Sequence, residues 1–230
     1  MVLGDAVITD RIGQSQAVQV RNATSADLAS VIDLHTVAFP DFPTTHLGRR
    51  FMTAFYGAFL NTPADLFRVA QTADGAIVGF AAGSIEPRAH HQRFYGTHLP
   101  LVTWVALRRI VRHPTFVVPL LLRVPRLMDA ILSRARGEAH APGTAQHNDE
   151  RTLTLLFLVI AQEARSGGIG RQMVADVEKQ AAVRHCTLIE LDTDVRNEPA
   201  QLFFERLGFV PEDAGSIVRF RKPVRARRDD

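Results

Sequence analysis

The spacing of apolar residues changes along the chain, and this change predicts a mixed fold of strands and helices. Alternating or continuous apolar runs, typical of strands, occur at residues 19–22, 66–72, 77–86, 152–160 and 187–192, and residues 209–222 are expected to form a last pair of strands. Apolar residues three or four apart, typical of amphipathic helices, follow Thr24, Thr44 or Thr45, Gly168 and Pro199. The order of these segments predicts strands and helices that alternate around a central sheet.

The N-terminal part of the chain carries clear boundary signals. Thr24, with Asp27 three residues later, predicts a helix N-terminus, and the Pro-Asp-Phe-Pro sequence at residues 40–43 ends that helix. The residues Ala-Asp-Gly at 73–75 predict the turn of a hairpin between the strands at 66–72 and 77–86.

A glycine-rich turn after residues 152–160 is the most informative stretch. Those residues are nearly all apolar or Thr, as in a central strand covered on both faces. The turn Arg-Ser-Gly-Gly-Ile-Gly at 165–170 then opens a helix, whose first N–H groups lack internal partners and favour anions. Gly168 and Gly170 would let a pyrophosphate approach the backbone, and Arg165 adds a full positive charge. The turn therefore predicts a site for a phosphorylated cofactor.

Two common phosphate-binding loops do not fit this turn. A P-loop needs Lys followed by Ser or Thr after its last glycine, but Arg171 and Gln172 follow Gly170. A dinucleotide fingerprint needs three spaced glycines close to the strand, which are absent here. What remains is the pattern Arg-x-x-Gly-x-Gly.

A second motif occurs downstream, at residues 197–209. It has an Asn-x-x-Ala start at Asn197 and Ala200 and a short helix that ends in Leu-Gly-Phe. In this order the two motifs resemble the GCN5-related N-acetyltransferase (GNAT) family, which holds acetyl-coenzyme A, and residues 20–27 are similar to its first strand and helix cap. The resemblance covers residues 18–87 and 152–223. A plain surface turn would explain neither Arg165 nor the second motif.

The resemblance implies an α/β (α+β) fold. Its sheet would be mixed and mostly antiparallel, with six to seven strands flanked by about four helices. Residues 18–223 would form one acetyltransferase domain, interrupted by a basic helical insertion at 88–150. Residues 1–17 would be a flexible tail and residues 224–230 a charged one.

The resemblance also implies where the cofactor binds. The strand ending at residues 158–160 would diverge from its neighbour and leave backbone groups for the pantetheine arm, with the Ile160 N–H on the acetyl carbonyl oxygen. Amides of residues 168–171 would hold the pyrophosphate. The expected cofactor contacts are Leu158, Val159, Ile160, Arg165, Ser166, Gly167, Gly168, Ile169, Gly170, Arg171, Asn197, Ala200, Phe203 and Phe204. The histidines show no metal-ligand spacing, so no metal is expected.

Asp192 is the first candidate for the general base, because the family often carries an acid there that faces the acceptor. The alternative is that Asp192 or Asp194 caps a turn or pairs with an arginine. Glu86, at the end of a predicted strand, is a second candidate. His90 and His91 are expected in a solvated loop.

The proton donor is where the chain departs from the family pattern. Many relatives place a tyrosine seven residues after the Asn, and here that position is Phe204, preceded by Phe203. Either solvent or another group, such as Tyr95, protonates the thiolate, or the protein is a non-catalytic acyl-coenzyme A sensor.

Residues 88–150 are rich in arginine, and Pro114, Pro119 and Pro125 predict two or three short helices instead of one long one. The segment could rest on anionic lipid, form a lid or dimer contact, or pack on the core with its arginines in water; the last two are favoured. Arginines at a pocket mouth could also attract a nucleotide-linked sugar.

Composition narrows the remaining classes. The chain has 230 residues, 46% hydrophobic and 22% charged, as in ordinary globular proteins, and its net charge of +3 gives no indication of nucleic acid binding. Cys186 is the single cysteine, consistent with a cytoplasmic protein, and residues 1–17 lack the apolar core of a signal peptide.

The sequence therefore predicts an acetyl-coenzyme A-dependent N-acetyltransferase. Its acceptor would be a primary amine of a small molecule, with an amino sugar as one candidate. A membrane-surface or partner-docking protein that uses the arginine-rich insertion is a further alternative, and a homodimer is left open.

Overall fold

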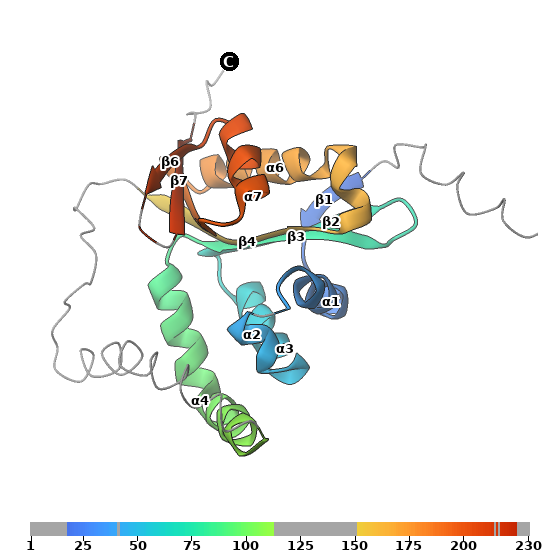
Figure 1. Cartoon of the computed structure of the whole chain (residues 1–230), viewed down its shortest axis with the longest axis vertical. Coiled ribbons are helices and arrows are strands. Elements are labelled where there is room, and N and C mark those ends of the chain that lie inside the picture. The colour runs from blue at the N-terminus through green and yellow to red at the C-terminus, as the bar shows by residue number, and fades with distance from the viewer. Residues whose placement is uncertain (1–17, 41, 113–150, 214, 216, 225–230) are drawn as a thin grey trace, which may run out of the picture.

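A computed structural model of the chain describes residues 18–40, 42–112, 151–213, 215 and 217–224. Its strands form one seven-stranded sheet in the order β1-β2-β3-β4-β5-β7-β6 (Figure 1). Neighbouring strands are antiparallel except β4 and β5, which are parallel. The predicted mixed, mostly antiparallel sheet is thereby confirmed. The strands are β1 (Val18–Asn22), β2 (Asp65–Thr72), β3 (Ile77–Ser84), β4 (Thr152–Ile160), β5 (Leu188–Asp194), β6 (Val210–Asp213) and β7 (Ile217–Pro223).

Helices cover both faces of the sheet (Figure 1). One face, here called the α1 face, carries α1 (Leu28–Ala38), α2 (Pro43–His46), α3 (Arg49–Ala58) and α4 (Pro87–Arg112). The opposite α6 face carries α6 (Ile169–Val183) and α7 (Glu198–Arg206). Within the described ranges, no helix combines the length and the apolar character needed to cross a bilayer.

Each face has its own hydrophobic core. On the α6 face, four apolar residues spaced four apart along α6 (Ile169, Met173, Val177 and Ala181) pack against the sheet and are at most 7% exposed. On the α1 face, the core is aromatic, and its largest fully buried side chains include Tyr56, Phe51 and Phe80. The sheet is therefore anchored on both sides, as the apolar run of β4 predicted.

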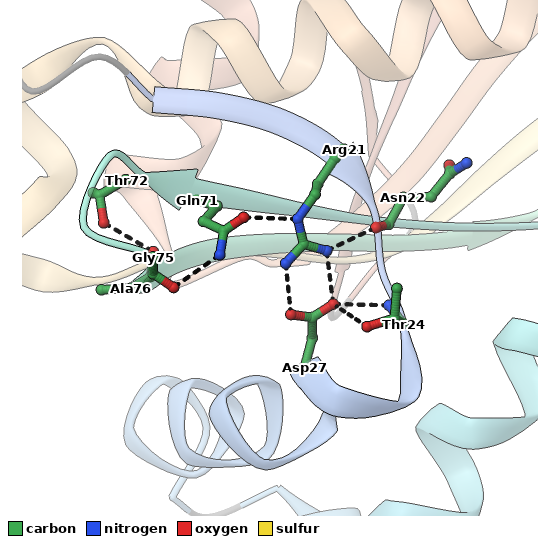
Figure 2. Close-up of polar contacts among 8 residues, drawn as sticks. All are labelled: Arg21, Asn22, Thr24, Asp27, Gln71, Thr72, Gly75 and Ala76. Atoms are coloured by element: carbon green, nitrogen blue, oxygen red, sulfur yellow. Dashed lines mark hydrogen bonds and ion pairs between the residues drawn. The ribbon is translucent and has the colours of Figure 1, made fainter.

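The start of the first helix is fixed by the predicted Thr24–Asp27 pair (Figure 2). The Asp27 carboxylate accepts hydrogen bonds from Thr24 N at 2.8 Å and Thr24 Oγ1 at 2.9 Å, and two at 2.8 Å from the guanidinium of Arg21. These bonds, above all those from Arg21, lower the pKa of Asp27 to about 2. Arg21 Nε also donates to Gln71 Oε1 at 2.8 Å, which ties β1 and the helix start to β2.

Several boundaries differ from the predictions. The second N-terminal helix is divided into α2 and α3 at Gly48, whose φ of +85° is unfavourable for other residues. Strand β3 ends at Ser84, two residues early, and β5 continues to Asp194.

The two histidines expected in a solvated loop are instead part of α4, which is a correction. His90 is 2% exposed, and its Nδ1 lies 2.8 Å from Asp65 Oδ2 at the start of β2. The helix is kinked at His98 and contains Pro100, which lacks an N–H for the helical hydrogen-bond ladder. The insertion thus begins as a helix packed on α3, and its predicted breaks at Pro114, Pro119 and Pro125 lie outside the described residues.

Candidate active site

Strand β4 separates from β5 at a β-bulge. The two strands pair from Thr152↔Leu188 to Leu155↔Leu191 and no further, although both continue. On the other edge of β4, Leu155 is opposite Gly83 and Phe157 is opposite Ala82, so Leu156 is an extra residue. Such an insertion bends a strand, and here the bend coincides with the last β4–β5 pair. The divergence predicted for this strand is therefore present.

Glycine at position 83 is needed for this bulge. A Cβ added to Gly83 would lie 2.7 Å from the Thr154 carbonyl oxygen and 3.3 Å from Leu155 Cα. Backbone atoms cannot yield as a flexible side chain can, so only glycine lets β3 and β4 approach this closely.

The backbone of β4 beyond the bulge points into the gap. Ala161 N donates to Val78 O at 2.8 Å, across the edge shared with β3. Because successive residues of a strand direct their polar groups to opposite edges, the N–H and C=O of Ile160 face the gap, as do those of Leu158. These are backbone groups of the kind that the prediction assigned to the pantetheine arm and the acetyl carbonyl.

The gap leads to the glycine turn that opens α6. A short 3₁₀ helix (Gln162–Gly167) ends at Gly168, which has φ +73° and precedes the first residue of α6. Gln172 N is bonded to Gly168 O at 3.1 Å, so the amides of residues 169–171 precede the helical ladder. A Cβ at Gly168 would meet no atom within 4 Å, so the space beside Gly168 at the start of α6 is open.

Arg165 joins this turn to the strand end. Its side chain is exposed, and its Nε donates to Ile160 O at 3.3 Å. A positive charge therefore stands between the end of β4 and the start of α6, as the motif predicted. Arg171 is also exposed, in the first turn of α6. An open helix start flanked by arginines fits a diphosphate.

The second glycine of the motif makes room for a ring of α7. A Cβ at Gly170 would lie 3.1 Å from Phe203 Cζ and 3.8 Å from Ile160 Cγ1. Phe203 therefore lies beside both the turn and the strand end, next to the expected cofactor path. This contact gives Gly170 a packing role in addition to the predicted backbone approach.

Phe204, in contrast, is a core residue, although its ring was expected at the cofactor. It is 7% exposed and packs against Phe209 and Phe220, with ring centroids 5.5 and 5.9 Å away. A tyrosine in place of Phe204, seven residues after Asn197, would have its ring in the same buried position.

Asn197, one of the expected cofactor contacts, has a structural role in this chain. Its Oδ1 accepts a hydrogen bond from Ala200 N at 3.3 Å and so caps α7. The two residues of the Asn-x-x-Ala start are thereby joined to each other at the N-terminus of this helix.

Asp192 lies where the two strands separate. Leu191 is the last residue of β5 paired with β4, and its side chain belongs to the core under α6, so Asp192 points to the α1 face. Arg219 on β7 donates to both its carboxylate oxygens, at 2.8 and 3.0 Å, and this bond raises the pKa of the guanidinium. Asp194 likewise pairs with Arg196, at 2.9 Å. Asp192 therefore lies where a general base is expected, and it also forms the arginine pair that was given as the alternative to that role.

Glu86 does not meet the other candidates. Its neighbour Ser84 is opposite Thr154, and Ile160 lies six residues further along β4, about 20 Å away at the usual rise of a strand. The exposed Glu86 carboxylate is 3.5 Å from Arg93 instead. Glu86 therefore lies far from a carbonyl held at Ile160, which favours Asp192 over Glu86 as the base.

Both tyrosines of the chain, Tyr56 and Tyr95, belong to the core on the α1 face, on the opposite side of the sheet from α6. Tyr56 OH is buried on the α1 face and bonded to His35 Nδ1 at 2.6 Å. Tyr95 is half-buried on α4 and stacks on His91. The structure therefore gives no support to Tyr95 as a substitute proton donor.

The sequence reasoning missed three features of the site. It did not pair Arg219 with Asp192, because strand register is not visible in one sequence. It did not place the bulge, although Gly83 inside a predicted strand is a recognised signal for one. It also did not connect Phe157 with residues 39–42, whose rings meet on the α1 face.

Comparison with known proteins agrees with this geometry. Residues 126–209 match the model of the acetyltransferase (GNAT) family. No curated protein matches the chain.

Solved structures resemble the fold at low sequence identity. An N-acetyltransferase from Staphylococcus aureus Mu50 has a TM-score of 0.55 at 12% identity, over 91% of this chain and 99% of that one. The PaiA N-acetyltransferase from Thermoplasma acidophilum, in complex with coenzyme A, has a TM-score of 0.54 at 14% identity, over 90% and 99%. A putative GNAT acetyltransferase from Desulfovibrio desulfuricans has 0.53 at 15%, over 91% and 100%. At these identities the likeness shows the fold alone. Together, the family match, the sheet order and the glycine turn show that this chain is similar to the GNAT acetyltransferases, a family whose cofactor is acetyl-coenzyme A.

Proposed function

We propose that this protein transfers the acetyl group of acetyl-coenzyme A to the primary amine of a small molecule, by direct attack of the amine. The observation that carries the proposal is the gap between β4 and β5, which runs from the bulge at Leu156 to the open helix start at Gly168. A strand edge without a neighbouring strand, ending at an anion-binding helix start, suits a long polar arm that ends in a diphosphate.

The cofactor would be held almost entirely by backbone. Amides of residues 169–171 would bind the diphosphate together with Arg165, and the edge of Leu158 and Ile160 would bind the pantetheine arm. When bound, acetyl-coenzyme A supplies a thioester whose carbon–sulfur bond breaks, with its electron pair left on sulfur, as the carbon–nitrogen bond to the amine forms. The N–H of Ile160 would stabilise the charge that grows on the carbonyl oxygen.

Asp192 would accept the proton that the ammonium group must lose before attack, through an intervening water. Arg219 occupies one acceptor position on each carboxylate oxygen, and each oxygen keeps another for a water molecule. The second proton leaves the nitrogen after attack, and solvent would return a proton to the thiolate, because Phe203 and Phe204 cannot donate one. A coenzyme A thiol of ordinary acidity needs no stronger acid than water.

Release of free thiol tests this proposal against the sensor alternative. Calorimetry should show binding of acetyl-coenzyme A, and a panel of small primary amines should release thiol in its presence. Binding without thiol release from any amine would support the non-catalytic sensor, which Phe203 and Phe204 favour.

The Asp192→Asn variant tests the base. We expect kcat/KM to fall about 100-fold and its rise with pH to change, the usual effect of losing a general base. Asp194→Asn is the matched control, since Asp194 is an arginine-paired carboxylate two residues later on the same strand face, and its pH–rate profile should equal that of the wild type. An unchanged ascending limb in Asp192→Asn would exclude Asp192 as the base.

A further inference from the structure

Three phenylalanine rings meet on the α1 face at the gap, and we call them the ring cluster: Phe39, Phe42 and Phe157. Their centroids are 5.8 Å apart for Phe39–Phe42 and 6.1 Å apart for each of the other two pairs, all tilted or edge-to-face. Phe42 is 44% exposed, and the other two are half-buried. A large phenylalanine that stays this exposed leaves an aromatic surface open for contact.

The ring cluster stands beside the place where acetyl transfer is proposed. Phe157 follows the bulge residue Leu156 directly, so its ring flanks the point where β4 leaves β5. Its side chain packs with the α1-face core, and Asp192 also points to that face from the other side of the gap. An aromatic surface and a carboxylate thus share one face of the sheet, on either side of the opening.

Polar groups around the ring cluster are bonded to one another. His35, fully buried at its centre, contacts Tyr56 OH through Nδ1 at 2.6 Å and Thr44 Oγ1 through Nε2 at 3.2 Å. Thr45 Oγ1 donates to Phe39 O at 2.7 Å. Burial lowers the pKa of His35 to about 4, so its ring is neutral near pH 7. What these residues offer to a ligand is therefore ring surface instead of free hydrogen-bonding groups.

We infer that the acetyl acceptor is a primary amine that carries an aromatic group, which packs on the ring cluster while its nitrogen lies toward Asp192. This inference rests on the proposed function and names its substrate class. An aromatic group gains dispersion and edge-to-face contacts with the three rings. A sugar would bring hydroxyls to a surface whose hydroxyls and imidazole are already bonded, and leaving polar groups unpaired is costly. The acyl step itself is unchanged: the carbon–nitrogen bond forms, the carbon–sulfur bond breaks, and one ammonium proton leaves to Asp192.

Three primary amines distinguish the acceptor classes: 2-phenylethylamine, D-glucosamine and putrescine. We expect the full-length protein to acetylate 2-phenylethylamine with kcat/KM at least about tenfold above either of the others, the factor that corresponds to one good aromatic contact. Equal or higher kcat/KM for D-glucosamine or putrescine would overturn the inference and leave the acetyltransferase proposal standing. Bound acetyl-coenzyme A without thiol release from any amine would overturn both.

The Phe42→Ala variant tests whether the ring cluster is responsible. Its preference for 2-phenylethylamine over D-glucosamine should fall about tenfold, while the Kd for coenzyme A stays unchanged. Val37→Ala is the control, since Val37 is an exposed apolar residue (78%) just before the ring cluster on α1, and it should keep the wild-type preference. Calorimetry of 2-phenylethylamine with the coenzyme A-loaded protein gives a second readout, in which Phe42→Ala should weaken binding by the same factor. A preference that survives Phe42→Ala would overturn the inference.

Discussion

Replacing Gly168 by Leu should abolish cofactor binding and leave the fold in place. The residue has φ +73°, and any side chain there would extend into the open space beside Gly168 at the start of α6. Left-handed backbone costs a non-glycine residue about 1–2 kcal/mol, which a domain of this size tolerates. The variant should therefore fold with a modestly lower free energy of unfolding.

The loss of binding should be much larger than the loss of stability. A hydrogen bond from an amide to a charged phosphate contributes about 1.5–3 kcal/mol, and a leucine side chain over the turn would prevent at least two of them. Losing about 3–6 kcal/mol of binding energy raises Kd about 100-fold to 10,000-fold. Calorimetric titration with coenzyme A measures this directly.

Gly48→Leu is the matched control for backbone strain. Gly48 also has a positive φ, +85°, immediately precedes a helix, and has no atom within 4 Å of an added Cβ. The two variants should be destabilised to a similar extent in urea unfolding, but only Gly168→Leu should lose coenzyme A. If Gly168→Leu binds coenzyme A within about threefold of the wild type, the reasoning on this turn is refuted.

Two further predictions concern stability and pH. The Asp27→Asn variant should have a free energy of unfolding about 1–2 kcal/mol below that of the wild type at pH 7. The lowering of the Asp27 pKa from 3.8 to about 2 corresponds to about 2 kcal/mol. Solvent reduces this contribution, because the Arg21 side chain is 28% exposed. Because the pKa of Asp27 is lower in the folded state, this difference in stability from the wild type should be present above pH 4 and disappear as the pH falls through 2. Urea unfolding at each pH measures it. A difference that persists at pH 2 would contradict the Arg21–Asp27 assignment. The pKa of His35 is about 4 in the folded state and 6.5 in the unfolded state, so the unfolded state takes up the proton first as the pH falls. The free energy of unfolding of the wild type should therefore fall by about 3 kcal/mol between pH 6.5 and 4. The His35→Gln variant should not show this loss. Identical pH dependence of unfolding in the two proteins would show that His35 is not buried as a neutral ring.

Much of the fold could be predicted from the sequence because local signals were strong. The apolar run of β4 predicted its bounds without error, and the Thr24–Asp27 spacing identified the helix start that Arg21 then completes. The order of the two family motifs predicted the sheet class and the cofactor turn. These signals act within a few residues, where spacing alone determines which side chains meet.

The features that the sequence did not reveal depend on contacts between distant segments. Asp192 meets Arg219 only because β5 and β7 pair in one register, and a shift of one residue would turn either side chain to the other face. His90 was expected in solvent because a histidine next to another polar residue suggests a loop; its burial depends on Asp65, 25 residues earlier. Phe204 was assigned to the cofactor by motif position, but the orientation of α7 directs its ring to Phe220 and the core.

A crystal structure of the protein with coenzyme A tests the central claim most directly. We expect the diphosphate oxygens within hydrogen-bond distance of the N–H groups of residues 169–171, and the pantetheine arm along the free edge of β4 between Leu158 and Ile160. A diphosphate bound anywhere else in the complex would contradict the account.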